Sequence, residues 1–198
     1  HIGIPNVVTS ILASYRGYDT FGETVVIYTA GIAVLVLLYG GVSKTSKINK
    51  EKNKYMDNLI LKVCTKVLFT PIILFGLYVQ FHGDFGPGGG FQAGVIVAAA
   101  FILYAMVFSV EDCKVIMPPK LNFFLLALGA FLYGFVGIIG LILGDPYLSY
   151  DVLGSTKEAG QHIGILLVEF GVGLTVCNVM ISLFYSFANF NFGKKNND

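Results

Sequence analysis

The stretch GILLVEFGVGLTVCNVMISLFYSF, residues 164–187, decides the fold of this chain. It is apolar almost throughout and contains a single charged residue, Glu169. A helix of about 20 mostly apolar residues spans the hydrocarbon core of a bilayer, which is about 30 Å thick. A helix that covers the core of a soluble protein would show a charged or polar face to water, and this stretch has none. Residues 164–187 therefore predict a membrane-spanning helix.

Four further apolar runs have the same character. They cover residues 24–42, 63–81, 91–109 and 123–143. The run 63–81 is the weakest, because Lys66 lies in its first turn and Pro71 lies inside it. A lysine near a helix end can extend its ammonium group to the headgroups, and lipid-embedded helices tolerate proline. The sequence predicts an all-α integral membrane protein with about five transmembrane helices and short loops.

Composition excludes several classes of protein. Of the 198 residues, 55% are hydrophobic and 13% are charged, and the net charge is +1. Soluble domains carry about 25% charged residues, so a disordered tail, a basic nucleic-acid-binding domain and an ordinary soluble enzyme are excluded. The three cysteines are far apart and lack metal-ligand spacing, so we expect free thiols and neither a zinc site nor a disulfide framework. We expect no metal site.

The lysines indicate an orientation in the membrane. Of the 13 Lys and Arg residues, all except Arg16 and Lys157 fall in or beside segments on one side of the predicted helices. Cytoplasmic loops carry the excess of positive charge. The N-terminal segment is therefore expected outside, and the C-terminus is expected in the cytoplasm.

The first 23 residues differ from the rest of the chain. Apolar residues recur there at helical spacing after Asn6, a plausible N-cap; they are Val7, Val8, Ile11, Leu12 and Tyr15. This pattern predicts either a short amphipathic helix on the outer surface or the end of a longer helix. Residues 16–19 are expected to form a turn, and residues 20–23 have the spacing of a capping box directly before the first span.

A glycine-rich segment, HGDFGPGGGF at residues 82–91, connects the second and third predicted spans. A phosphate-binding loop needs Lys-Ser or Lys-Thr after its last glycine, and Phe91-Gln92 occupies that place, which argues against nucleotide binding. Glycines allow a tight turn and a close approach of another backbone. Two roles stay open, packing of the turn and a direct place on an ion path. The motif residues are His82, Pro87, Gly88, Gly89, Gly90 and Phe91.

Glu169 is the only carboxylate deep inside a predicted span. A charged residue at the bilayer centre costs about 2.5–3.5 kcal/mol, so Glu169 should face protein or water. His162 lies two turns earlier on the same helix face, about 10 Å along the axis. The pair is either half of a proton or cation relay, or a neutral Glu169 bonded to a neighbouring helix with His162 at the outer interface.

A second charged cluster, Arg16, Asp19 and Glu23, is expected near the outer surface. Its structural interpretation is a charged turn with a helix cap. Its functional interpretation is ion access or the docking of another subunit.

Several of these motifs together resemble a known family. FGLY at residues 75–78, His82-Gly83, PGGGFQAG at residues 87–94 and AAA at residues 98–100 resemble the B subunit of the Mrp/Mnh-type multisubunit sodium/proton antiporters. The resemblance covers residues 57–188 and implies a domain of four transmembrane helices.

The N-terminal part carries a second resemblance. NVVT at residues 6–9 and RGYDTFGE at residues 16–23 are similar to the C-terminal part of the large A subunit and to the E subunit of membrane-bound, energy-converting hydrogenases. The resemblances imply an element with one transmembrane helix at residues 1–43 and a Lys-rich cytoplasmic linker at residues 44–56. A polar tail follows at residues 189–198. The fusion departs from the family, in which these elements are often separate chains.

The family resemblance implies a multi-pass subunit in the bacterial cytoplasmic membrane, in a complex that exchanges Na⁺ for H⁺. Its expected partners are the other antiporter subunits and the bilayer, with no nucleic acid, no cofactor and no enzymatic activity. The ion- and proton-route candidates are Glu169, His162, Glu23, Asp19 and Arg16. Two alternatives stay open, a subunit of a hydrogenase or complex I-like assembly and a purely structural scaffold. No inverted repeat is visible, which argues against a stand-alone carrier.

Overall fold

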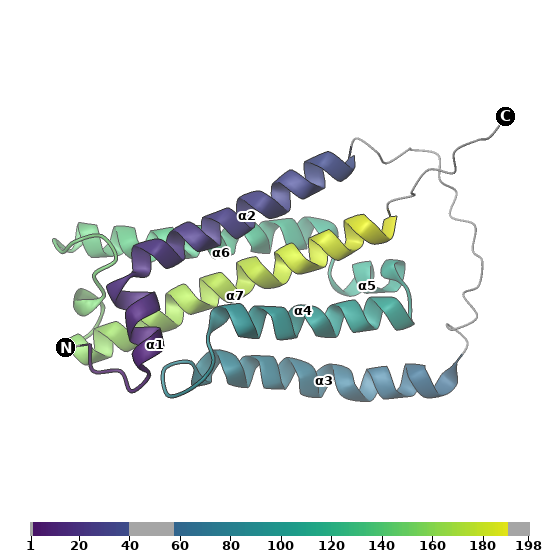
Figure 1. Cartoon of the computed structure of the whole chain (residues 1–198), viewed down its shortest axis with the longest axis horizontal. Coiled ribbons are helices and arrows are strands. Elements are labelled where there is room, and N and C mark those ends of the chain that lie inside the picture. The colour runs from purple at the N-terminus through teal and green to yellow at the C-terminus, as the bar shows by residue number, and fades with distance from the viewer. Residues whose placement is uncertain (1, 40–57, 190–198) are drawn as a thin grey trace.

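The structure, a computed structural model, describes residues 2–39 and 58–189. Within them every regular element is helical, as Figure 1 shows. In chain order these are α1 (Val7–Thr9), the π-helical turn η1 (Ser10–Tyr15), α2 (Gly17–Tyr39), α3 (Leu59–His82), α4 (Gly90–Val107), α5 (Val110–Ile116), α6 (Pro119–Ile142), the 3₁₀ turn η3 (Asp151–Leu153) and α7 (Lys157–Asn189).

The five predicted spans are confirmed as helices. Each is long and apolar enough to cross a membrane; they are Gly17–Leu38, Leu59–His82, Gly90–Val107, Pro119–Ile142 and Lys157–Ala188. The sequence also sets where two of them begin. Asn58 caps α3 by accepting a hydrogen bond from the Ile60 amide at 3.1 Å, and Pro119 occupies the first turn of α6, where its missing N–H costs nothing. Pro71 lies inside α3 without ending it.

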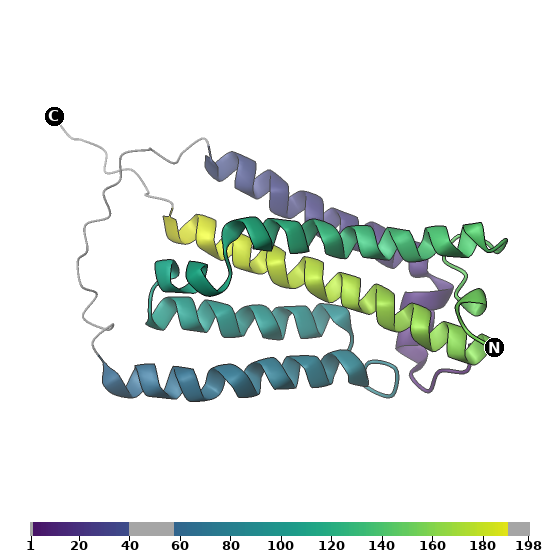
Figure 2. The same ribbon diagram turned by 180° about the vertical axis from the view of Figure 1, so that it is seen from behind.

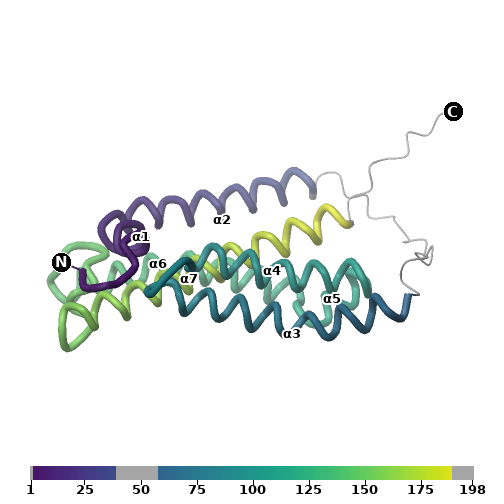
Figure 3. The backbone as a smooth tube through the Cα atoms, turned by 60° about the horizontal axis from the view of Figure 1, so that its bottom comes forward, coloured from purple at the N-terminus to yellow at the C-terminus, as the bar shows by residue number. Residues whose placement is uncertain are grey.

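Helix α7 is the centre of the bundle. It packs against α6, α4 and α2, whereas α3 packs mainly on α4. Figures 1 and 3 show α2 and α3 at opposite edges of the molecule. One end, which we call the glycine-loop end, carries the N-terminal segment, residues 83–89 and residues 143–156. The opposite end carries α5 and is called the α5 end (Figure 2).

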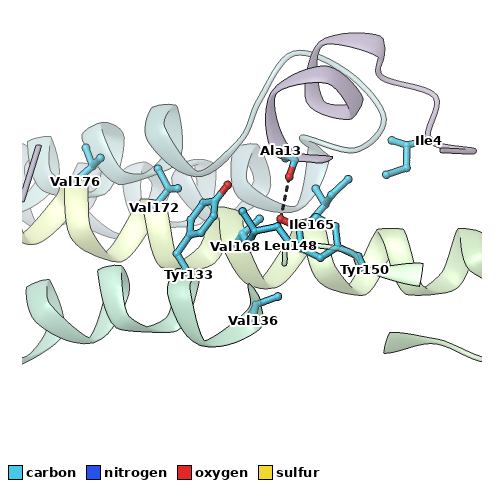
Figure 4. Close-up of a cluster of buried hydrophobic side chains, with 10 residues drawn as sticks. All are labelled: Ile4, Ala13, Tyr133, Val136, Leu148, Tyr150, Ile165, Val168, Val172 and Val176. Atoms are coloured by element: carbon cyan, nitrogen blue, oxygen red, sulfur yellow. Dashed lines mark hydrogen bonds between the residues drawn. The ribbon is translucent and has the colours of Figure 1, made fainter. Parts of the chain in front are cut away.

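The main apolar core lies between α6, α7 and the N-terminal segment (Figure 4). Two buried tyrosines join these parts. Tyr150 donates a hydrogen bond to the Ala13 carbonyl at 2.9 Å, and Tyr133 donates one to the Gly17 carbonyl at 2.8 Å. Burial raises the pKa of the Tyr150 phenol, so this group stays protonated as a donor. The N-terminal segment is thereby fixed to the rest of the bundle.

Glycines let α4 approach α7 closely. A Cβ at Gly90 would overlap the carbonyl oxygen of Glu169, and a Cβ at Gly94 would lie 2.7 Å from the carbonyl oxygen of Gly173. At both positions a side chain would come too close to the backbone of α7, so only glycine fits without a backbone shift. The glycines thus place the start of α4 directly against the turn of α7 that carries Glu169.

The predicted turn at residues 16–19 and the predicted capping box at residues 20–23 are wrong. Residues 17–23 form the first two turns of α2, and only Arg16, at φ −112° and ψ 30°, separates this helix from η1. The Thr20 hydroxyl bonds to the Leu12 carbonyl at 2.7 Å instead of capping a helix. Because η1 is already helical, a single irregular residue is enough to connect it to α2, and no turn of several residues forms.

The predicted amphipathic segment is helical, as one turn of α1 followed by η1. Asn6 is the N-cap, as predicted, and accepts a hydrogen bond from the Val8 amide at 3.1 Å. The linker predicted at residues 44–56 lies outside the described residues. Of the predicted tail, only Asn189 is described, as the last residue of α7.

Candidate functional site

A cavity of about 280 Å³ lies at the glycine-loop end, between the N-terminal segment, α2, α4, α6 and α7. Its walls combine a few polar side chains with apolar ones. The polar lining residues are Thr9, Thr20, Glu23, Thr24, Gln92, Tyr133 and Glu169. The motif residues Gly88, Gly89, Gly90 and Phe91 complete one wall.

Glu169 lies in α7 against the glycine-rich loop. A Cβ at Gly83 would lie 2.8 Å from Glu169 Oε2, and a Cβ at Gly89 would lie 3.1 Å from Glu169 Oε1. Gly89 also has a φ of +128°, which favours glycine. The loop therefore reaches the carboxylate only because these positions lack side chains. The close packing that the glycine motif allows therefore brings the loop against Glu169, a candidate route residue.

Glu23 lines the same cavity from the second turn of α2. The two acids lie far apart in the sequence, and no Lys, Arg or His is among the lining residues. Carboxylate, hydroxyl and amide oxygens are ligands for hard cations, and a carboxylate in an apolar setting also holds a proton readily. The cavity can therefore accept a small cation or a proton at either acid.

His162 pairs with an acid that the sequence does not single out. Its Nδ1 lies 2.9 Å from Asp84 Oδ2, and the Asp84 side chain is 10% exposed. The second oxygen of Asp84 is buried and has no hydrogen-bond partner among the described residues. Asp84 follows Gly83, which touches Glu169. The glycine loop thus carries both Asp84, which contacts His162, and Gly83, which packs against Glu169.

The N-terminal segment holds this loop in place. The Asn6 side chain donates to the carbonyls of Gly83 and Gly86 at 2.7 and 2.6 Å. The Thr9 hydroxyl donates to the same Gly83 carbonyl at 2.8 Å. A second hollow of about 580 Å³ adjoins the cavity between this segment and the loop; the two share Val8, Gly88 and Gln92. The loop, the hollow and the cavity form one connected region.

The remaining predicted residues lie near this region but not in the cavity. Arg16 and Asp19 form an exposed ion pair at 2.7 Å with each other. The His82 ring stacks on Tyr78, with 5.1 Å between the ring centroids. Pro87 lines the adjoining hollow. The predicted cluster of Arg16, Asp19 and Glu23 therefore separates, since only Glu23 lines the cavity.

Three residues of the region escape the sequence reasoning. Asp84 is quoted in the glycine motif but treated there as part of a turn, although it is the one acid of that loop. Tyr133 and Gln92 lie in apolar runs and meet Glu169 only through the packing of α4 and α6 on α7. A search for polar residues within the apolar runs would have found both.

One known protein family matches more than half of the chain. This family, described as a domain related to the MnhB subunit of Na⁺/H⁺ antiporter, matches residues 60–182. The chain belongs to the MnhB family. The match includes Asp84, His162 and Glu169 and excludes Glu23. The chain is also 33% identical over 133 residues to a protein of Staphylococcus aureus described as an antiporter subunit, mnhB2, and this match covers 66% of the chain and 94% of that protein.

Two solved structures share the fold of this MnhB-family chain. One is the membrane-bound sulfane sulfur reductase, an archaeal respiratory membrane complex, with 28% identity and a TM-score of 0.71 over 93% of this chain and 80% of the other. The other is the Mrp complex of Dietzia sp. DQ12-45-1b, with 24% identity and a TM-score of 0.75 over 98% of this chain. The chain spans 22% of the length of that Mrp chain. Both likenesses extend over the N-terminal element as well as the MnhB domain.

Proposed function

We propose that this chain is a membrane subunit of a multisubunit Na⁺/H⁺ antiporter complex and that its Glu169–Glu23 cavity lies on the route of the cation or the proton. Membership of the MnhB family supports the antiporter assignment, and the five apolar helices support a multi-pass protein of the bacterial cytoplasmic membrane. We infer that the chain contributes to transport and assembly and catalyses no reaction of its own.

The observation that carries this proposal is that the buried-helix acid Glu169 and the exposed acid Glu23 line one cavity, with no basic residue among the described residues that line it. A carboxylate inside the bilayer costs about 2.5–3.5 kcal/mol when it is charged and uncompensated. A bound proton or Na⁺ removes that cost. Glu169 is therefore most stable when it holds what the complex transports.

Asp84 and His162 form the access to this cavity at the glycine-loop end. His162 is half-buried and in contact with Asp84, and Asp84 neighbours the loop residue that touches Glu169. An imidazole exchanges protons with water near neutral pH. In the proposed orientation, with the glycine-loop end outside, the pair passes protons between the outer surface and Glu169.

Replacing Glu169 by Gln in the assembled complex tests the proposal. Gln keeps the size of the side chain but can neither release a proton nor bind a cation by charge. We expect Na⁺-dependent proton flux in membrane vesicles to fall by roughly tenfold or more, because a unit charge in such a site interacts by more than about 1.4 kcal/mol.

Glu111→Gln is the matched control, because Glu111 is an exposed acid of α5 that pairs only with Lys114. This control should leave the flux unchanged. Unchanged flux in Glu169→Gln with normal assembly would show that the cavity is not on the route. The chain would then be a scaffold subunit.

The likeness to the sulfane sulfur reductase complex favours one alternative, a subunit of a redox-driven membrane complex. Purification of the native complex separates the two. Co-purifying antiporter subunits support the proposal, and co-purifying iron–sulfur or nickel–iron subunits support the alternative.

A further inference from the structure

A second polar cluster lies between α6 and α7, on the side of Glu169 that faces the α5 end. It consists of Asn122 on α6 and of Asn178 and Ser182 on α7. Asn122 and Asn178 are 1% and 2% exposed, and Ser182 is buried as well. Asn122 donates from its amide nitrogen to the Asn178 carbonyl at 3.1 Å and to the Ser182 hydroxyl. The cluster therefore joins the two helices within the apolar bundle.

The hydrogen bonds fix which way both amides point. The Asn122 nitrogen faces a backbone carbonyl, which only accepts, so the NH₂ group must lie on that side. The Asn178 nitrogen faces the Leu174 carbonyl at 2.7 Å, and the same reasoning applies. Both Oδ1 atoms are then left over. Each is buried, and neither has a hydrogen-bond partner among the described residues.

The cluster is consequently acceptor-rich and neutral. Its NH₂ groups are engaged within the protein, while two amide oxygens remain available. A buried acceptor without a partner destabilises a protein by about 1–3 kcal/mol, and lipid offers no donor in compensation. Such oxygens attract small cations and the hydrogen atoms of water, and they repel anions.

Polar side chains continue along α7 on both sides of the cluster, first against α6 and then against α5. Towards Glu169, the Thr175 hydroxyl donates to the Gly171 carbonyl at 3.1 Å. Towards the α5 end, the Tyr185 hydroxyl lies 3.2 Å from Cys113 Sγ and 3.3 Å from the Met117 carbonyl. At a rise of 1.5 Å per residue, Asn178 lies about 13 Å from Glu169 along α7. The cluster is therefore an intermediate point between the cavity and the α5 end.

We propose that Asn122, Asn178 and Ser182 form a second, charge-neutral station for a small monovalent cation, Na⁺ or hydronium, between the Glu169 cavity and the α5 end. This inference rests on the proposed function of the cavity. Neutral oxygens bind a cation more weakly than a carboxylate does, which suits a site that must release it again. The two stations divide the crossing of the bundle into shorter steps.

Two variants of Asn178 test the proposal in the assembled complex. Asn178→Leu removes the amide oxygen at similar volume, whereas Asn178→Asp keeps an oxygen there and adds a charge. We expect the Leu variant to raise the half-saturating Na⁺ concentration of antiport by roughly three- to tenfold, or to shift its pH profile by the same factor in proton concentration. A change of this size corresponds to the loss of one polar ligand. We expect the Asp variant to lower the half-saturating Na⁺ concentration or leave it unchanged.

Val179→Ala is the control, because Val179 is a buried neighbour on α7 that packs against Gly31. It should change neither parameter. A change in half-saturating Na⁺ identifies Na⁺ as the ion, and a shifted pH profile at constant Na⁺ dependence identifies hydronium. If Asn178→Leu does not assemble, Asn178→Asp and Ser182→Ala decide between the outcomes in the same assay.

Parameters that match the unaltered complex in all assembled Asn178 and Ser182 variants would overturn the inference. Glu169→Gln separates that result from a failure of the proposed function. If Glu169→Gln abolishes flux while the Asn178 variants behave normally, the cavity keeps its role and the neutral station is rejected.

Discussion

Glu169 and Asn178 lie on the same helix, yet the first faces a cavity and the second is enclosed between two helices. Around Glu169 the partners of α7 are a glycine loop and an N-terminal segment held by hydrogen bonds. Around Asn178 the partner is the continuous helix α6. The ionisable group thus lies where irregular backbone and a cavity adjoin α7, and the neutral amides lie where two continuous helices pack together.

The difference has a cause in the backbone. Polar side chains of the N-terminal segment bind the carbonyls of Gly83 and Gly86 in the loop at the glycine-loop end, where Gly83 and Gly89 are buried. Irregular backbone at membrane depth is tolerated where it is buried in protein or lines a cavity. At the other cluster each backbone carbonyl is already used by a helix, so the amides bind carbonyls in addition.

Disrupting the contact between α4 and α7 should have the largest effect. In Gly90→Ala the new Cβ would overlap the Glu169 carbonyl oxygen, so the two helices must separate. Overpacking of this kind destabilises a protein by about 1–3 kcal/mol or more. We expect strongly reduced amounts of the subunit in the membrane, measured by immunoblotting, and loss of the assembled complex on native gels.

Gly22→Ala is the matched control, because Gly22 lies in α2 with no neighbouring atom within 4 Å of a Cβ. Alanine there should be neutral, or stabilising by about 0.5–1 kcal/mol. Normal amounts of Gly90→Ala would mean that the cavity region tolerates movement of α4, contrary to the close packing of α4 on α7.

Asp84→Asn should have the next largest effect and should act only on transport. It keeps the size of the side chain but removes the negative partner of His162. We expect proton flux to fall by roughly three- to tenfold, less than in Glu169→Gln, with normal assembly. The control is Asp145→Asn, an acid at the same end that bonds to Ser149. Equal flux in the two variants would remove Asp84 and His162 from the access route.

Tyr150→Phe tests how the N-terminal segment is held. It removes the bond to the Ala13 carbonyl and should lower the free energy of unfolding by about 0.5–1.5 kcal/mol. Thermal unfolding of the purified complex measures this loss, and Tyr18→Phe, an exposed tyrosine, is the control. A fall as large in Tyr18→Phe as in Tyr150→Phe would contradict this role.

The same tyrosine gives a pH dependence with a defined sign. Burial raises the folded-state pKa of Tyr150 above its unfolded value of about 10. Its contribution to stability is therefore complete below about pH 10 and is lost as the pH rises through the folded-state pKa. Tyr150→Phe should unfold with a weaker dependence on alkaline pH.

The sequence predicts the five helices well because each is an unbroken apolar run, and this signal is local. It also singles out Glu169, since a lone carboxylate within such a run is conspicuous. It misplaces residues 16–23, where one irregular residue, Arg16, and the first two turns of α2 replace the predicted turn and capping box. Asp84, Asn122 and Asn178 acquire their meaning only from partners far along the chain.

The last prediction concerns the orientation of the bundle in the membrane and involves the smallest effect, because the cysteine substitutions that test it should leave transport unchanged. Ser155 and Val115 are exposed at opposite ends of the bundle, and a cysteine at each reports its side once the exposed Cys64 is replaced by Ser. In intact cells, a membrane-impermeant maleimide should label Ser155→Cys, and it should label Val115→Cys only after permeabilisation. The opposite pattern would leave the cavity and the amide cluster unchanged but would reverse the order in which an ion meets them. A charged cavity would then receive ions from the cytoplasm, and the lysine-rich α5 end would face outward, against the excess of positive charge that cytoplasmic loops carry. The lysine distribution therefore favours the orientation in which the glycine-loop end and its cavity face outward.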